Sequence, residues 1–78
     1  MRDVTQKEVN QFFADLQKEM NRARTETVPM LDASGLADKM KCEKQSIYNW
    51  LSGKRTPTLM NLFMFGAVCG KKLKITFE

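Results

Sequence analysis

The chain has 78 residues, which is enough for one domain and no more, and a core of that size leaves a domain only marginally stable on its own. The formal net charge of +4 favours polyanions as partners, although surfaces of mixed sign are common. The sequence has no leader-like segment and no apolar run of bilayer-spanning length, so we expect a cytoplasmic protein.

Two cysteines and no histidine limit the chemistry available to the chain. Cys42 and Cys69 stand where the helical pattern needs an apolar side chain, so we expect both in the core; a disulfide is the alternative. Two distant cysteines without histidine give no zinc-ligand spacing, and we expect no metal and no cofactor. An enzyme is disfavoured, because the chain also lacks a paired-carboxylate pocket and a phosphate-cradling glycine loop.

A long amphipathic helix is predicted near the N-terminus. Thr5 followed by Glu8 fits a capping box, which marks the first turn of this helix. Apolar residues then recur every three or four positions, as expected of a helix that covers a core. These residues are Val9, Phe12, Phe13, Leu16, Met20 and Ala23. The β-branched residues that follow favour a short strand over residues 24–28, just before Pro29.

The stretch from Leu36 to Leu51 predicts two short helices that meet at a tight turn. Asp32 suits the N-cap of the first helix. Lys41 ends that helix where the turn needs a positive φ, at a cost of about 1 kcal/mol relative to glycine. Glu43 stands where the second helix begins, and the helix dipole favours a carboxylate there. The inward-facing residues of the pair are Leu36, Ala37, Met40, Ile47, Trp50 and Leu51.

The outer face of the second helix carries side chains that can read DNA bases. The residues that point away from the predicted core are Lys44, Gln45, Tyr48 and Asn49. Glutamine and asparagine can bind adenine bidentately, lysine can reach guanine, and a tyrosine ring can pack on a thymine methyl. A plain solvated helix face is the alternative, and the surrounding pattern favours base contact over it.

A basic turn follows this helix. Gly53 is the predicted left-handed C-terminal residue, and Lys54, Arg55 and Thr56 come directly after it. Two cations and a hydroxyl, on a turn with free backbone N–H groups, suit phosphate contacts that fix the register without reading sequence. An ordinary basic turn is the alternative.

The last predicted helix is apolar on every side. Thr56 and Pro57 suit its N-cap and first position, and the helix continues from Thr58 to Cys69. A small domain cannot cover both faces of such a helix, so we expect the outer face to meet another subunit. The outer face includes Met60, Phe63, Met64 and Ala67. The alternative is that residues 1–20 or the C-terminal tail cover this face within the same chain.

The C-terminal residues 71–78 alternate apolar and polar side chains, which is the periodicity of a strand. The apolar side consists of Leu73, Ile75 and Phe77. A lone strand is unstable, so this segment needs an antiparallel partner. The partner is either residues 25–28 of the same chain or the same segment of a second copy across a two-fold axis, and the sequence leaves both open.

From Leu36 to Gly70 the chain resembles the Cro and phage-repressor type of helix-turn-helix domain, which is lambda-repressor-like and of the XRE type. The residues that carry the resemblance are Leu36, Ala37, Ile47, Trp50, Gly53, Lys54, Arg55, Pro57, Leu59, Leu62, Phe65, Cys69 and Gly70. The chain departs from the pattern at Lys41, where the family usually has glycine, and at Glu43, where it usually has serine or threonine. The family's fifth helix is replaced by another segment.

The resemblance implies a mainly α fold, a lambda-repressor-like helix-turn-helix domain of about four helices with a short C-terminal β-strand. The whole chain, residues 1–78, would be one domain, with a helix-turn-helix core at 32–52 and a dimerisation helix and strand at 57–78. Cro-like proteins use a terminal strand for dimer contacts. The expected dimer interface comprises Met60, Phe63, Met64, Ala67, Leu73, Ile75 and Phe77.

The resemblance also assigns roles to single residues. Lys44, Gln45 and Asn49 match positions through which family members read bases, and Tyr48 shares their face. Glu43 and Ser46 match flanking positions. The residues expected at phosphates are Glu43, Ser46, Lys54, Arg55, Thr56 and Ala33, the last at the N-terminal end of the helix that Asp32 caps.

The function that these expectations favour is a homodimeric, sequence-specific transcription regulator, a repressor that reads a pseudo-palindrome in double-stranded DNA. Its partners would be DNA and a second copy of the chain. The alternative is a protein-interaction module, such as an antitoxin that holds a toxin through the apolar Met60 to Val68 face or the C-terminal strand. Both can coexist in one molecule.

Overall fold

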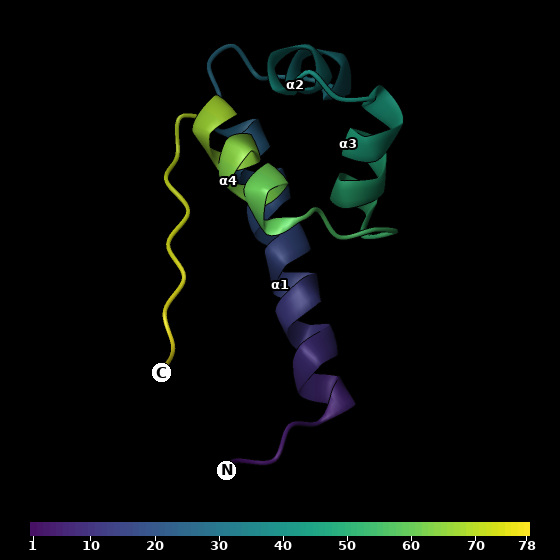
Figure 1. Ribbon diagram of the computed structural model, residues 1–78. Coiled ribbons are helices and arrows are strands. Elements are labelled where there is room, and N and C mark those ends of the chain that lie inside the picture. The colour runs from purple at the N-terminus through teal and green to yellow at the C-terminus, as the bar shows by residue number, and fades with distance from the viewer.

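The computed structural model describes residues 1–78 as a small all-helical domain of four helices (Figure 1). The helices are α1 (Gln6–Thr25), α2 (Ala33–Met40), α3 (Lys44–Ser52) and α4 (Leu59–Val68). The long helix α1 packs against α3 and α4, and α2 packs against the same two helices. Only the C-terminal half of α1 is covered in this way, and its N-terminal half projects beyond the other helices (Figure 1). No helix is both long enough and apolar enough to cross a membrane.

Side-chain caps explain where three of the helices begin. The Thr5 hydroxyl accepts a hydrogen bond from the Glu8 N–H at 3.2 Å, and the Asp32 carboxylate accepts one from the Gly35 N–H at 2.8 Å, which confirms both predicted N-caps. The Glu8 carboxylate pairs with Arg2 instead of returning to the backbone of Thr5, so the capping box is only half formed.

The start of α4 differs from the prediction. Its N-cap is Thr58, whose hydroxyl accepts a hydrogen bond from the Asn61 N–H at 3.2 Å. Thr56 and Pro57 therefore precede the helix instead of opening it. Starting at Leu59 lets the Thr58 hydroxyl satisfy one of the free N–H groups of the first turn.

The predicted strand at residues 24–28 is wrong, because α1 continues to Thr25 and a turn follows it. The hydroxyls of Thr25 and Thr27 donate to the carbonyls of Arg22 and Arg24 at 2.9 and 2.7 Å. The Thr27 hydroxyl also accepts from the Leu31 N–H at 2.8 Å. These local bonds give the backbone an alternative to sheet pairing, so the β-branched residues end a helix here and do not form a strand.

The predicted C-terminal strand is absent, and with it the β-strand expected of the fold class. Residues 71–78 form an extended tail that leaves α4 and runs beside α1 (Figure 1). Beyond the bond from the Lys71 N–H to the Gly66 carbonyl, at 2.8 Å, the tail makes no backbone hydrogen bond. A strand needs a partner, and the segment predicted to be that partner is helix and turn.

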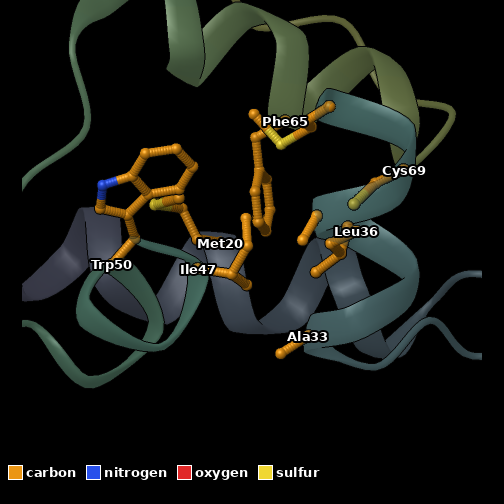
Figure 2. Close-up of a cluster of buried hydrophobic side chains, with 9 residues drawn as sticks. Met20, Ala33, Leu36, Ile47, Trp50, Phe65 and Cys69 are labelled. Carbon is orange, nitrogen blue, oxygen red and sulfur yellow. The ribbon is translucent and has the colours of Figure 1, made fainter. Parts of the chain in front are cut away.

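Nine buried apolar residues from all four helices and the residue after α4 form one core (Figure 2). Figure 2 shows Phe65 in the middle of this cluster, between Trp50 and Met20 on one side and Leu36 and Cys69 on the other. Leu36 and Ile47 have no exposed surface and Phe65 retains 1%. The members are Met20, Ala33, Leu36, Ala37, Met40, Ile47, Trp50, Phe65 and Cys69.

Both cysteines are free thiols, so the alternative of a disulfide is wrong. Cys69 is buried in the core as predicted, whereas Cys42 is half-buried at the edge of the core. Burial raises the pKa of the Cys69 thiol, and burial together with the neighbouring Glu43 carboxylate raises the pKa of the Cys42 thiol. Both thiols therefore stay protonated at neutral pH.

We predict that Phe65→Ala lowers the free energy of unfolding by about 3–5 kcal/mol, because the truncation leaves a cavity at the centre of the core. Tyr48→Ala, an aromatic truncation at a side chain that is 50% exposed, should cost less than about 1 kcal/mol. Urea unfolding followed by circular dichroism measures both values. Equal losses would show that Phe65 is not the centre of the core.

Candidate nucleic-acid interface

The outer face of α3 is set by the two residues that anchor its inner face. Ile47 and Trp50 are buried against the core, which turns the opposite side of the helix to solvent. The structure brings the four residues predicted to read bases together on that side. Lys44, Gln45 and Tyr48 are exposed, and Asn49 is half-buried beside them.

Asn49 connects the outer face of α3 to the basic turn. Its side-chain oxygen accepts a hydrogen bond from the Gln45 amide at 3.1 Å, which orients the two amides relative to each other. Its backbone carbonyl accepts from the Arg55 N–H at 3.1 Å and from the Ser52 hydroxyl at 3.3 Å. A shift of the turn would therefore move the end of α3, so the candidate base-reading residues and the candidate phosphate-binding residues form one rigid unit.

The turn after α3 presents its cations to solvent. Gly53 is left-handed with φ 81°, as predicted, and its N–H donates to the Trp50 carbonyl. Lys54, Arg55 and Thr56 are all exposed. None of the chain's four ion pairs involves Lys54 or Arg55. Both cations are therefore available to an anionic partner.

The excess positive charge of the chain is concentrated around α3. Residues 39–56 carry five cations and one carboxylate, so their local net charge of +4 equals that of the whole chain. The cations are Lys39, Lys41, Lys44, Lys54 and Arg55, and the carboxylate is Glu43. Every ion pair instead draws on carboxylates at the α1 end of the chain, namely Glu8, Glu19 and Glu26. This distribution gives the α3 region the largest local excess of positive charge in the chain.

The remaining residues predicted at phosphates differ in how much they expose. Glu43 is exposed at the N-cap of α3, and its side chain makes no capping hydrogen bond. Ser46 is half-buried, and Ala33 retains only 6% of its surface, so Ala33 offers its backbone N–H and not its side chain. That N–H lies in the first turn of α2, where no carbonyl of the same helix can accept from it.

The turn between α2 and α3 has the predicted left-handed residue, because Lys41 has a positive φ of 55°.

Two residues of α1 that no sequence pattern singled out hold the end of α3. The side-chain amides of Gln17 and Asn21 both donate to the Leu51 carbonyl, at 3.0 and 2.9 Å. This carbonyl lies in the last turn of α3, where no N–H group of the same helix can donate to it. The available signal was a pair of amide side chains one helical turn apart on α1. We name this arrangement the amide clamp.

Gly53 has a left-handed backbone and also lies against the amide clamp. A Cβ at this position would lie 2.6 Å from the Gln17 side-chain oxygen. Gly70 has a similar φ of 73°, but a Cβ there would have no neighbouring atom within 4 Å. The two glycines thus share a left-handed backbone and differ in crowding.

The described side chains contain no group of three or more histidine, cysteine, aspartate or glutamate residues placed to hold a metal ion. Comparisons with protein-family models, with curated proteins and with solved structures each find no match to this chain.

We predict that Gly53→Ala destabilises the fold more than Gly70→Ala does. Both substitutions cost about 1–2 kcal/mol for placing a side chain on a left-handed backbone, but only Gly53→Ala also displaces Gln17. Urea unfolding measures the two losses.

A Gln17→Ala background provides the control for this comparison. It removes the clash but not the backbone strain, so the extra cost of Gly53→Ala should largely disappear there. Strictly additive effects of Gly53→Ala and Gln17→Ala would contradict the close approach of the two residues.

Proposed function

We propose that the chain is a homodimeric, sequence-specific DNA-binding regulator of the helix-turn-helix type, with α2 and α3 as the motif. The observation that carries this proposal is the outer face of α3, where four polar side chains share the side opposite the core. Asn49 joins this face through its backbone carbonyl to a basic turn, and neither Lys44 nor the cations of that turn make an ion pair. The resemblance to the Cro and phage-repressor type points to the same function.

In this proposal α3 enters the major groove, and its outer face reads base edges. Gln45 and Asn49 are suited to adenine, because their amides offer a donor and an acceptor in one plane. Lys44 is suited to guanine O6 and N7, and the Tyr48 ring to a thymine methyl. The Gln45–Asn49 hydrogen bond fixes the two amides before DNA arrives, which lowers the entropy lost on binding.

Phosphate contacts would hold the helix in register. Lys54 and Arg55 supply charge, and Thr56 and Ser46 supply hydroxyl donors. The contribution of Ala33 is its backbone N–H at the start of α2, where the helix dipole also favours an anion. The carboxylate of Glu43 would repel a phosphate, so a contact at that position is confined to its backbone N–H.

Two copies of α3 are needed to read a pseudo-palindrome, with their centres about 34 Å apart along one face of the duplex. The outer face of α4 supports self-association, because neither α1 nor the tail covers it. Met60 is 70% exposed, Phe63 is 42% exposed and Met64 is 38% exposed. Bound copies would repress transcription by occupying the operator.

Binding of a partner protein is the second candidate function, and an exposed apolar surface on α1 favours it. Phe12 and Phe13 are 61% and 43% exposed on the projecting half of that helix. An antitoxin would cover such a surface with its toxin and could bind DNA as well. The composition and native mass of the complex purified from its own source distinguish the two functions. A homodimer contains only this chain, whereas an antitoxin is purified together with a second protein.

Selection of bound fragments from random duplex DNA tests the main proposal. Purified protein should enrich a pseudo-palindrome with half-sites about one helical turn apart. Failure to enrich any sequence over bulk genomic DNA would contradict the proposal.

On the selected site, Gln45→Ala and Asn49→Ala should each weaken binding by about 1–3 kcal/mol and leave binding to random duplex nearly unchanged. The reason is that a base-edge contact contributes only where the matching base is present. Titrations by fluorescence anisotropy on both duplexes measure this difference. Equal losses on the two duplexes would remove these residues from base readout.

Arg55→Ala should weaken binding to all duplexes and reduce the salt dependence of log K by about one unit, since one phosphate neutralisation is lost. Lys18→Ala is the matched control, because Lys18 is an exposed cation on α1, outside the cationic residues 39–56. Titrations across a series of salt concentrations measure the slopes. An unchanged slope for Arg55→Ala would show that Arg55 contacts no phosphate.

A further inference from the structure

A hollow with a volume of about 240 Å³ lies between α1 and the basic turn that follows α3. We name it the Trp50 hollow, and its lining includes Phe13, Leu16, Met20, Trp50, Arg55 and Pro57. Met20 and Trp50 are buried members of the core, whereas Phe13 and Arg55 are exposed. The hollow therefore has an apolar floor and a cation at its opening.

The indole N–H of Trp50 is a hydrogen-bond donor without a partner in the chain. The side chain lies almost entirely in the core, since Trp50 retains 7% of its surface. Figure 2 shows the indole nitrogen on the edge of the ring that faces away from Phe65. This nitrogen is not sealed within the protein, because Arg24 Nε is the only sealed side-chain nitrogen or oxygen that lacks a partner. A tryptophan buried to this extent usually has an acceptor for its N–H, and the Trp50 hollow is where an acceptor can lie.

The polar groups of Trp50 and Arg55 favour a ligand that brings hydrogen-bond acceptors and negative charge. Indole and guanidinium groups donate hydrogen bonds and accept none. None of the chain's four ion pairs involves Arg55, and no aspartate or glutamate lines the hollow. A carboxylate would accept charge-assisted hydrogen bonds from such donors.

The apolar lining and the volume restrict the rest of the ligand. Pockets that hold drug-sized ligands measure roughly 300–1,000 Å³, so a hollow of about 240 Å³ suits a ligand with one ring. Phe13 is 43% exposed, and Leu16 and Pro57 are half-buried, so a bound ring would remove apolar surface of all three from water. A hydrated ion such as inorganic phosphate gains nothing from that surface.

We propose that the Trp50 hollow binds a small aromatic carboxylate and that this ligand weakens DNA binding. The carboxylate accepts from the Trp50 indole N–H and neutralises Arg55, while the ring packs on the apolar lining. Binding of the ligand needs no DNA. Its effect on DNA rests on the proposed function, in which Arg55 contacts a phosphate.

Two hydrogen bonds connect the Trp50 hollow to the candidate interface. Gln17 also lines the hollow, and its amide donates to the Leu51 carbonyl at the end of α3. The Arg55 N–H donates to the Asn49 carbonyl on the same helix. A carboxylate that neutralises Arg55 removes charge that would attract a phosphate. Ligand and DNA should therefore weaken each other's binding by the same factor.

Trp50 is the only tryptophan of the chain, so its signals report on the hollow directly. Phenylacetate is the probe, and the controls are phenylacetamide, which is neutral, and acetate, which has no ring. Added to the full chain without DNA, phenylacetate should change the Trp50 fluorescence and move the indole N–H resonance to lower field. Phenylacetamide should bind at least about tenfold more weakly, because it lacks the charge that Arg55 neutralises, and acetate should not bind measurably.

Arg55→Ala should weaken phenylacetate binding by roughly tenfold or more, since the charge-assisted contact is lost. Lys54→Ala is the matched control for ligand binding, because Lys54 is an exposed cation on the same turn but does not line the hollow. Its dissociation constant for phenylacetate should equal that of the unmodified chain. Fluorescence titration measures all three values.

A pair of neighbouring phenylalanines tests the site of the ring. Phe13→Ala should weaken phenylacetate binding by about fivefold or more, because it removes one apolar wall. Phe12→Ala is the matched control and should leave the affinity unchanged, since Phe12 lines the groove between α1, α4 and the C-terminal tail instead. Both side chains are exposed, so neither truncation removes a core residue.

Three outcomes of these titrations overturn the ligand site. One is the absence of any change in fluorescence or in the indole resonance up to the solubility limit of phenylacetate. Another is equal affinity for phenylacetate and phenylacetamide, which would show that no cation holds the carboxylate. The third is equal weakening by Arg55→Ala and Lys54→Ala, which would indicate attraction to the net charge of the turn and not a site.

The effect on DNA is measured on the selected duplex. Saturating phenylacetate should weaken binding by about fivefold or more and reduce the salt dependence of log K by about one unit, the same reduction as Arg55→Ala causes. It should have no further effect on the Arg55→Ala variant. Unchanged DNA affinity with phenylacetate bound would overturn the coupling.

The outcomes separate this inference from the proposed function. A protein that selects a duplex but does not respond to phenylacetate would refute the ligand site and leave DNA binding intact. A protein that binds phenylacetate at Trp50 but selects no DNA sequence would refute the proposed function, and the coupling with it, and leave the ligand site intact.

Discussion

The burial of Ile47 and Trp50 is the constraint on which the candidate interface depends. Ile47 has no exposed surface and Trp50 retains 7%, so α3 has little freedom to rotate about its axis. Helical periodicity then fixes which side chains face outward. The amide clamp adds a second restraint at the C-terminal end of α3, because Gln17 and Asn21 hold the Leu51 carbonyl against α1. Rotation and tilt are therefore set by different contacts.

The N-terminal residues 1–38 and the α3 region, residues 39–56, differ in net charge. Residues 1–38 carry five cations and seven carboxylates, whereas residues 39–56 carry five cations and one carboxylate. The ion pairs of α1 neutralise cations on that side, and Arg22 illustrates this, since its hydrogen bond to Glu19 and the nearby carboxylates raise its pKa. A polyanion approaching the molecule would therefore be attracted to α3 and its turn before any base contact forms.

Features determined by neighbouring residues could be predicted from the sequence, and features that depend on distant residues could not. The N-caps at Thr5 and Asp32 and the positive φ of Lys41 follow from chemistry within a few positions. The amide clamp joins residues 30 and 34 positions apart, and no local pattern specifies that pairing. Residues 24–28 do not form the predicted strand because their threonine hydroxyls make local hydrogen bonds. The C-terminal strand does not form because residues 25–28, its predicted partner within the chain, are helix and turn.

The α3 side and the tail lie on opposite sides of α4 and α1 (Figure 1). The tail therefore leaves the outer face of α3 uncovered, as a helix that enters a major groove would require. The α3 side and the tail share no residue, and α4 lies between them. Phe65 of α4 is 1% exposed and packs in the same core as Ile47 and Trp50, the anchors of α3. The fold thus keeps the candidate DNA-reading surface and the C-terminal tail apart, while α3 and α4 share one small core.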